Sequence, residues 1–286
     1  MATKNLTLNS YAKINLFLHI TGKREDGYHN LQTIFQFIDL KDTLTFYINN
    51  TDTMSINSNL KICADIEDNL IYKAAQLIKP HANKISGYDI SIKKNIPMGA
   101  GLGGGSSNAA TTLLALNQLW QCNLNKQELI HIANKLGADV PIFLHGQTCW
   151  AEGTGNIFSK INITEQYILL IKPQIHISTK TLFNHLDLKK TYKPITPNEY
   201  NYITTNNAFE DIVRKENTEL SNQLDKLSPH NKFRMTGTGS CFFILSDNKT
   251  ELDKIQRNIN KLLDTSVTKT LQFLPIREHI LRGNVP

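Results

Sequence analysis

The segment PMGAGLGGGSSN at residues 97–108 holds five of the chain's fifteen glycines, followed by two serines and an asparagine. Glycines let a backbone come close to a phosphate and turn its N–H groups toward it. A helix predicted to begin near Ala109 adds unpaired N–H groups and the positive end of its dipole. A flexible surface loop is the alternative, but such a loop rarely places five glycines between a strand and a helix. The sequence therefore predicts a phosphate-binding segment.

Three familiar phosphate-binding loops do not fit this segment. The pattern Gly99-x-Gly101-x-x-Gly104 formally matches the dinucleotide-binding fingerprint. That fold needs a strand directly after the helix, and here a second helix is predicted. A Walker A loop needs a lysine before its serine, which Ser106 lacks, and the protein-kinase loop needs a V-A-I-K strand downstream, which is absent.

Two ionisable residues are candidates for phosphoryl-transfer chemistry, which needs an acceptor for a hydroxyl proton and a cation near the transferred group. Asp139 can be the acceptor, although Asp-Val-Pro at a helix start is also an ordinary N-cap, worth about 1 kcal/mol. From the residues alone, the cap is the commoner role. Lys13 and Asn15 fall on one face of an alternating strand, where a lysine and an amide ordinarily face solvent.

The elements that would position these residues include both strands and helices. We predict strands over residues 11–20, 31–38, 43–48, 88–92, 167–171 and 241–245, the first with one buried face. We predict helices over residues 68–79, 109–120, 126–136, 218–227 and 251–263, and another after Asp139. Asp68 is the expected N-cap and Pro80 the stop signal of the first helix, and Gly137 is the expected cap at the end of the third. The pattern fits two lobes that divide near residue 160.

Composition and charge exclude several classes of protein. The 286 residues are 40% hydrophobic and 20% charged, as in soluble globular proteins, and no apolar stretch approaches the roughly 20 residues that span a membrane. The net charge of +6 is spread thinly, with no basic run longer than two residues, which argues against nucleic acid binding. The four cysteines have no zinc-binding spacing and the N-terminus lacks a signal peptide, so we expect reduced cysteines and a cytoplasmic protein.

The glycine-rich segment resembles a fourth kind of phosphate-binding loop, found in the superfamily of galactokinases, homoserine kinases, mevalonate kinases and phosphomevalonate kinases. Within it, PMGAGLGGGSSNAAT is similar to the loop of the 4-diphosphocytidyl-2-C-methyl-D-erythritol kinases. Three more segments resemble that family: AKINLFLHITGKREDGYHNLQTIFQFIDLKDTL, LGADVPIFLHGQTCWAEGTG and MTGTGSCFF. The resemblance runs in order over most of the chain and is weakest over residues 184–232.

The resemblance implies an α+β fold of two lobes with the active site in the cleft between them. Residues 1–160 would form an ATP-binding, catalytic lobe like domain 2 of ribosomal protein S5, and residues 161–286 a ferredoxin-like α/β lobe. The implied activity is ATP-dependent phosphorylation of the 2-hydroxyl of 4-diphosphocytidyl-2-C-methyl-D-erythritol, giving the 2-phosphate and ADP, in non-mevalonate isoprenoid precursor synthesis. The alternatives are a kinase of the same fold acting on homoserine, mevalonate or another small alcohol, and a non-catalytic member of the fold.

The resemblance also assigns catalytic and ATP-binding roles. Asp139 would be the base, Lys13 would keep it ionised and stabilise the transferred group, and Asn15 would hydrogen-bond the substrate. Magnesium is implied by the chemistry, but no carboxylate pair dedicated to it can be named. The residues expected to bind ATP are Pro97, Met98, Gly99, Ala100, Gly101, Leu102, Gly103, Gly104, Gly105, Ser106, Ser107, Asn108 and Gly237.

For the substrate's cytosine, the resemblance implies an aromatic sandwich. Tyr28 would stack on the ring, His29 would bind its edge, Phe183 would close the other side and Thr179 would lie nearby. The Tyr28-His29 pair distinguishes a cytidine site from a homoserine or mevalonate site, which does not need it. The expected partner is therefore a small molecule carrying cytidine diphosphate, with no nucleic acid or membrane, bound by a monomer or homodimer.

Overall fold

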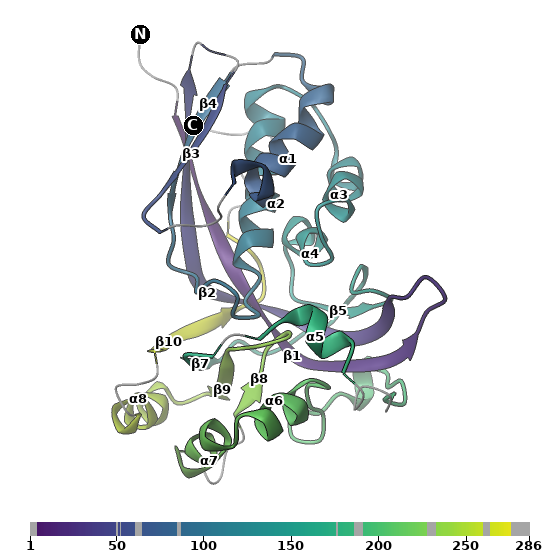
Figure 1. Cartoon of the computed structure of the whole chain (residues 1–286), viewed down its shortest axis with the longest axis vertical. Helices are drawn as coiled ribbons and strands as arrows, with labels where there is room; N and C mark the ends of the chain where they lie inside the picture. Colours follow the sequence, from purple (N-terminus) through teal and green to yellow (C-terminus); the bar gives the residue numbers. More distant parts are fainter. Residues whose placement is uncertain are drawn as a thin grey trace.

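Two long antiparallel strands, β1 (Asn5–Lys23) and β2 (His29–Asn49), form a hairpin that runs through the molecule (Figure 1). The computed structural model describes residues 5–49, 51, 53–60, 65–84, 87–175, 177–185, 191–227, 233–259 and 264–275. β1 is longer than predicted, and it is buried on both faces rather than one, so that Lys13, Asn15 and His19 lie inside. The prediction was wrong because β1 contributes to all three apolar clusters of the core, and neither face of residues 11–20 meets solvent.

The two strands predicted over residues 31–38 and 43–48 are one continuous strand, β2. Its register against β1 shifts between Tyr11, which pairs with Lys41, and Ala12, which pairs with Ile38. The extra residues of β2 form an irregularity of the bulge type. The polar residues around this point predict a break between two strands, although the strand continues through them.

The other strands join this hairpin in one ten-stranded sheet of order β3-β4-β2-β10-β7-β9-β8, in which β1 and β5 also pair with β2, and β6 pairs with β5. These strands are β3 (Met54–Ser58), β4 (Gly87–Lys93), β5 (Cys149–Glu152), β6 (Ile157–Lys160), β7 (Tyr167–Lys172), β8 (Arg234–Met235), β9 (Phe242–Ser246) and β10 (Asp264–Leu271). The predicted strands over residues 88–92, 167–171 and 241–245 are confirmed within one residue at each end. The sequence-based prediction lacks β10, which joins β2 to β7.

Helices cover one face of the N-terminal strands and pack against the C-terminal strands (Figure 1). The first group is α1 (Leu70–Ile78), α2 (Gly104–Leu119), α3 (Lys126–Asn134) and α4 (Val140–His145). The second is α5 (Thr179–Phe183), α6 (Glu210–Glu216), α7 (Thr218–Leu227) and α8 (Lys249–Asn258). The prediction of α7 is confirmed, and residues 260–263 of the helix predicted over 251–263 lie outside the described residues.

Two helix ends differ from the predicted ones. The N-cap of α1 is Asn69, whose side chain accepts from the N–H of Ile71, whereas Asp68 ends a short 3-10 helix (Ile66–Asp68). The C-cap of α3 is Lys135, before the predicted Gly137. In both cases the helix end lies within two residues of the predicted cap, and a neighbouring residue takes the capping position.

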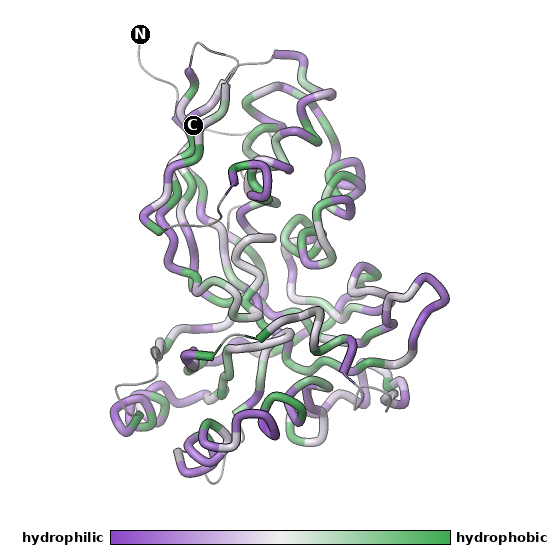
Figure 2. Tube along the Cα trace, in the orientation of Figure 1, coloured by the Kyte–Doolittle hydropathy of each residue, from purple (hydrophilic) through white to green (hydrophobic). Residues whose placement is uncertain are grey.

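The core has three apolar clusters. One lies between the N-terminal strands and α1 to α4, and the second lies among β7, β9, α6, α7 and α8. The third unites Ile14 on β1 with Ile168 and Phe243 from the C-terminal strands, so β1 joins the two parts of the molecule. Figure 2 shows hydrophobic stretches along the central strands and hydrophilic ones at the β1–β2 tip and in α8. The boundary near residue 160 stays a prediction.

Three cysteines, Cys122, Cys149 and Cys241, are buried and free, and Cys63 lies outside the described residues. Burial raises the pKa of the Cys149 and Cys241 thiols to about 12. These two thiols therefore stay protonated at neutral pH and are poor nucleophiles. Among the described residues, no helix is long and apolar enough to cross a membrane.

The buried Arg234 side chain ties β8 to β1, and its loss should destabilise the fold. Its guanidinium donates to the carbonyl oxygens of Leu16, Tyr202 and Thr205. Arg234→Met leaves these buried oxygens without donors, so we expect about 3 kcal/mol less stability and a Tm lower by roughly 5–10 °C. The control is Arg257→Met on the exposed side of α8. Equal Tm values of the two variants in thermal denaturation would contradict this role of Arg234.

Candidate active site

The glycine-rich segment connects β4 to α2, and its last part belongs to the helix. α2 begins at Gly104, earlier than the predicted start at Ala109, because residues 104–108 form its first turns. Gly103 is the N-cap with φ of 70°, and Gly99 and Gly101 have φ of 64° and 72°. Left-handed residues in such a loop turn successive N–H groups to one side.

The space around two of these glycines excludes any side chain. A Cβ at Gly101 would lie 2.2 Å from the carbonyl oxygen of Thr236. A Cβ at Gly103 would lie 2.8 Å from Phe143 Cζ and 3.1 Å from Lys13 Cε. The loop therefore packs directly against the side chain of the candidate catalytic lysine.

The loop binds to the rest of the protein through its carbonyl oxygens. The oxygens of residues 100–103 accept from Cys241 N at 3.3 Å, Thr236 Oγ1 at 3.4 Å, Lys13 N at 3.0 Å and Ser107 N at 2.8 Å, in that order. Across the described residues, the backbone amides of residues 98–106 donate to no protein acceptor. With the negative ends of its peptide groups held inward, the loop offers N–H groups to an anion, as the sequence predicts.

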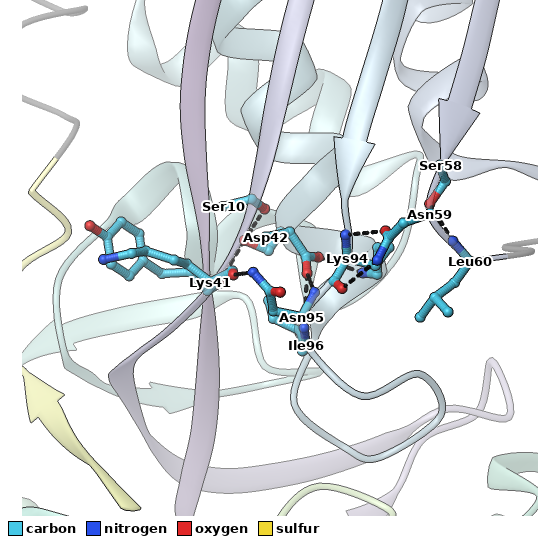
Figure 3. Close-up of polar contacts among 11 residues, drawn as sticks. Ser10, Lys41, Asp42, Ser58, Asn59, Leu60, Lys94, Asn95 and Ile96 are labelled. Carbon is cyan, nitrogen blue, oxygen red and sulfur yellow. Dashed lines mark hydrogen bonds and ion pairs between the residues drawn. The ribbon is translucent and has the colours of Figure 1, made fainter. Parts of the chain in front are cut away.

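The strand end that leads into the loop is held by a buried carboxylate. Asp42 on β2 accepts from Lys94 Nζ at 2.5 Å, and its other oxygen accepts from the N–H groups of Asn95 and Ile96 at 2.8 and 2.9 Å (Figure 3). Two opposite charges can stay inside a protein when they pair in this way. Nothing in the local sequence distinguishes Asp42 or Lys94 from surface residues, so neither was predicted to take part in the site.

Not every residue of the segment presents its side chain to a ligand. Ser107 is buried and its hydroxyl donates to the Tyr11 carbonyl at 2.6 Å while accepting from Ser10 Oγ at 2.7 Å. Asn108, Ala100 and Leu102 are also buried. The Ser107 hydroxyl therefore links α2 to β1. Ala100 and Leu102 have buried apolar side chains, so they can contribute only backbone groups to an anion site. The other residues of the segment lie partly or largely exposed.

Lys13 and Asp139 form an ion pair beside this loop. The Lys13 ammonium lies 3.1 Å from Asp139 Oδ2 and donates to Asn15 Oδ1 at 2.7 Å. The Lys13 side chain is 2% exposed and that of Asp139 is 37% exposed. The ammonium also lies 5.3 Å from the centre of the Phe35 ring, within the range of a cation–π contact. The strand pattern favours a solvent-facing Lys13, and this expectation is wrong. The structure instead brings Lys13, Asn15 and Asp139 together.

Asp139 precedes α4 but does not cap it through its side chain. Its backbone has φ of −87° and ψ of −8°, and its carboxylate makes no capping hydrogen bond. A capping side chain accepts from the second or third residue of the helix, and here the second is Pro141, which has no N–H. The carboxylate is therefore left to pair with Lys13 and to meet solvent.

A second glycine turn, after β8, packs against the first loop. Gly237 has φ of 56°, and a Cβ there would lie 3.1 Å from the carbonyl oxygen of Gly101. Asn207 holds the turn, because its side-chain N–H₂ donates to the carbonyls of Met235 and Gly237 at 2.9 and 2.8 Å. The structure thus brings Gly237 to the phosphate loop, and Asn207 is a supporting residue that no sequence motif indicated.

Two of the residues expected at the cytosine, Thr179 and Phe183, belong to α5, which contacts this turn at one end and His29 at the other. Thr238 Oγ1, next to Gly237, lies 2.9 Å from Thr179 Oγ1 at the start of α5. Phe183 ends α5 and lies 5.4 Å from the His29 ring, centre to centre. The helix α5 therefore places Thr179 beside the second glycine turn and Phe183 beside His29.

Tyr28 and His29 differ in their surroundings at the tip. The Tyr28 ring is 67% exposed, and the turn that carries it is held by Asp26, which accepts from the Tyr28 N–H at 3.1 Å. The pKa of His29 is lowered, first by burial and second by the positive charge of Lys23. A neutral imidazole at neutral pH has one donor and one acceptor, which suits the edge of a base.

Known proteins match this chain over both of its parts. The GHMP kinases N terminal domain matches residues 69–147, and the GHMP kinases C terminal domain matches residues 183–265. A 4-diphosphocytidyl-2-C-methyl-D-erythritol kinase of Francisella philomiragia is 51% identical over 267 residues, which cover 92% of this chain and 96% of the relative. The kinase of the same name from Acinetobacter baumannii is 47% identical over 87% of this chain and 90% of the relative.

Solved structures match the fold. A crystal structure of 4-(cytidine 5'-diphospho)-2C-methyl-D-erythritol kinase has a TM-score of 0.78 and 27% identity, and the match covers 93% of this chain and 99% of that one. The mevalonate kinase of Methanococcus jannaschii, at 16% identity and a TM-score of 0.65, shares the fold over 96% of this chain and 100% of that one. The α+β fold expected from the resemblance is confirmed. The chain belongs to the family of 4-diphosphocytidyl-2-C-methyl-D-erythritol kinases, among the GHMP kinases.

Proposed function

We propose that this protein transfers the γ-phosphoryl group of ATP to the 2-hydroxyl of 4-diphosphocytidyl-2-C-methyl-D-erythritol. The observation that carries the proposal is the Lys13–Asp139 ion pair, with the lysine stem packed against Gly103 of an anion-binding loop. A base, a cation and a cradle of free amides are the parts that phosphoryl transfer to an alcohol requires. The family to which the chain belongs supports the choice of substrate.

In this mechanism, the amides of residues 98–106 and the positive end of α2 hold the phosphates of ATP. Asp139 accepts the proton of the 2-hydroxyl, whose oxygen then bonds to the γ-phosphorus while the bond to the leaving ADP breaks. Lys13 holds Asp139 in place through the ion pair, and its positive charge stabilises the negative charge on the group in transfer. Asn15 fixes the ammonium from the other side.

Magnesium enters this proposal with ATP. Among the described residues, no three His, Cys, Asp or Glu side chains converge to hold a metal ion. Mg²⁺ in kinases is commonly held by substrate phosphates, water and one or two carboxylates, so a dedicated protein cage is not needed. The ion would neutralise phosphate charge, and Asp139 is the partly exposed carboxylate that pairs with Lys13 beside the loop.

The cytosine base of the substrate would bind at the hairpin tip, beside the end of α5 that carries Phe183. The Tyr28 ring offers an exposed face for stacking, His29 offers a neutral edge, and Phe183 stands against His29. Thr179 lies between this end and the second glycine turn, at a place suited to the rest of the substrate. The free, buried cysteines support the cytoplasm as the compartment in which the reaction takes place.

The experiment that tests the proposal is an assay of ADP release with ATP, Mg²⁺ and one of three alcohols. We expect turnover with 4-diphosphocytidyl-2-C-methyl-D-erythritol and none above background with homoserine or mevalonate. Turnover with either of the last two and not the first would replace the proposed substrate. No turnover with any of them, in protein that is folded, would favour a non-catalytic role.

The role of Asp139 as base predicts the effect of Asp139→Asn. The substitution removes the proton acceptor, so we expect kcat to fall by about 10³-fold. The substitution also leaves the buried Lys13 ammonium without its counter-charge, so we expect a lower Tm, and kcat is measured on folded protein well below the Tm of the variant. The control is Asp68→Asn, which removes an exposed carboxylate at the surface. Asp139 is not the base if its variant keeps kcat within twofold of the parent value.

The stacking role of Tyr28 predicts a change confined to one substrate. Base–aromatic stacking is worth about 1–3 kcal/mol, so Tyr28→Ala should raise KM for the cytidyl substrate roughly 5- to 150-fold. KM for ATP should stay the same, and Tyr28→Phe should keep most of the affinity. Tyr47→Ala, at an exposed tyrosine on β2, is the matched control. An equal rise of both KM values in Tyr28→Ala would rule out base stacking.

A further inference from the structure

The hydroxyl of Thr236 joins two parts of the active site that lie far apart in the sequence. Its Oγ1 accepts from the backbone N–H of Asn15 at 2.9 Å and donates to the carbonyl oxygen of Gly101 at 3.4 Å. Thr236 is fully buried, at 0% exposed, and Asn15 is 2% exposed. Bulk water therefore cannot replace the hydroxyl at the Asn15 bond, and the Gly101 bond is partly buried.

Each partner of this hydroxyl belongs to a different half of the proposed chemistry. Asn15 lies on β1 beside Lys13, whose ammonium contacts Asn15 Oδ1 at 2.7 Å and Asp139 at 3.1 Å. Gly101 lies in the middle of the phosphate loop, whose amides are free in the described structure. Thr236 thus stands between the strand that carries the cation and the loop that would hold the phosphates.

Thr236 differs from the other groups that hold this loop. In the described structure, the carbonyls of residues 100, 102 and 103 accept from backbone N–H groups, and that of Gly101 accepts from a side chain. Loss of the hydroxyl would leave the buried N–H of Asn15 without an acceptor and the partly buried carbonyl of Gly101 without this donor. The two backbones would have to separate or rotate to find other partners.

We propose that Thr236 is a positioning residue for phosphoryl transfer, whose hydroxyl fixes the phosphate loop relative to β1. It thereby sets the γ-phosphoryl group against Lys13 and Asp139. The inference rests on the proposed function, since it takes ATP as the occupant of the loop. A shift of about 1 Å between reacting groups can cost a factor of 10² in rate, whereas the loop's amides still bind phosphate after such a shift.

The test compares Thr236→Val, Thr236→Ser and Thr270→Val in the full chain. Valine keeps the shape and removes the hydroxyl, and serine restores the hydroxyl. Thr270 is a matched control, because it is 2% exposed and its Oγ1 accepts from the Gln166 N–H at 2.8 Å, away from the loop. For each variant, kcat and both KM values are measured on folded protein, at a temperature well below its own Tm.

We expect Thr236→Val to lower kcat at least about 10-fold, with KM for ATP and for the cytidyl substrate within about threefold of the parent. Thr236→Ser should recover most of kcat. Thr270→Val should lower Tm to a similar extent and leave kcat unchanged. Equal kcat values of Thr236→Val and Thr270→Val would overturn the inference, as would a Thr236→Ser variant no more active than Thr236→Val. An inactive parent enzyme would instead contradict the proposed function.

Discussion

A buried ammonium group must be paired, and this requirement at Lys13 organises the active site. The Lys13 side chain is almost fully enclosed between the Phe35 ring and the glycine loop, and its charge is met by Asp139 and by the amide oxygen of Asn15. An unpaired charge in this place would cost several kcal/mol. The fold therefore has to bring α4 and its preceding aspartate to β1, and the same step sets a base beside a cation.

The polarity of the backbone completes the site. The carbonyl oxygens of residues 100–103 are tied to β1, to α2 and to the turn around β8, and the amides of residues 98–106 are left free. A loop with its acceptors satisfied and its donors exposed favours an anion without any charged side chain of its own. The close packing at Gly101 and Gly103 explains why no larger residue can stand there. The second glycine turn fits against this loop for the same reason.

Much of this arrangement follows from local sequence, and the rest depends on long-range partners. The glycine pattern predicted an anion site, and the alternation of β1 put Lys13 and Asn15 on one face. Only the family resemblance raised Asp139 above an ordinary cap, because its pairing with Lys13 spans more than a hundred residues of chain. Pro141 removes one of the two amides that a cap at Asp139 could reach, and only the structure shows that the Asp139 side chain makes no capping bond.

Other features had no local signal at all. β10 pairs with strands from both parts of the molecule, and Asp42, Thr236 and Asn207 act through partners distant in the sequence. Burial of both faces of β1 likewise depends on the packing of the C-terminal strands against it. A polar residue that is buried for such a reason has the same local pattern as one on the surface.

The measurement that tests the account most directly is a crystal structure with a non-hydrolysable ATP analogue and 4-diphosphocytidyl-2-C-methyl-D-erythritol bound together. The account predicts the β- and γ-phosphates at the amides of residues 98–106 and the 2-hydroxyl within hydrogen-bonding distance of the Asp139 carboxylate. It would be contradicted by phosphates bound elsewhere, or by a 2-hydroxyl that faces a different base.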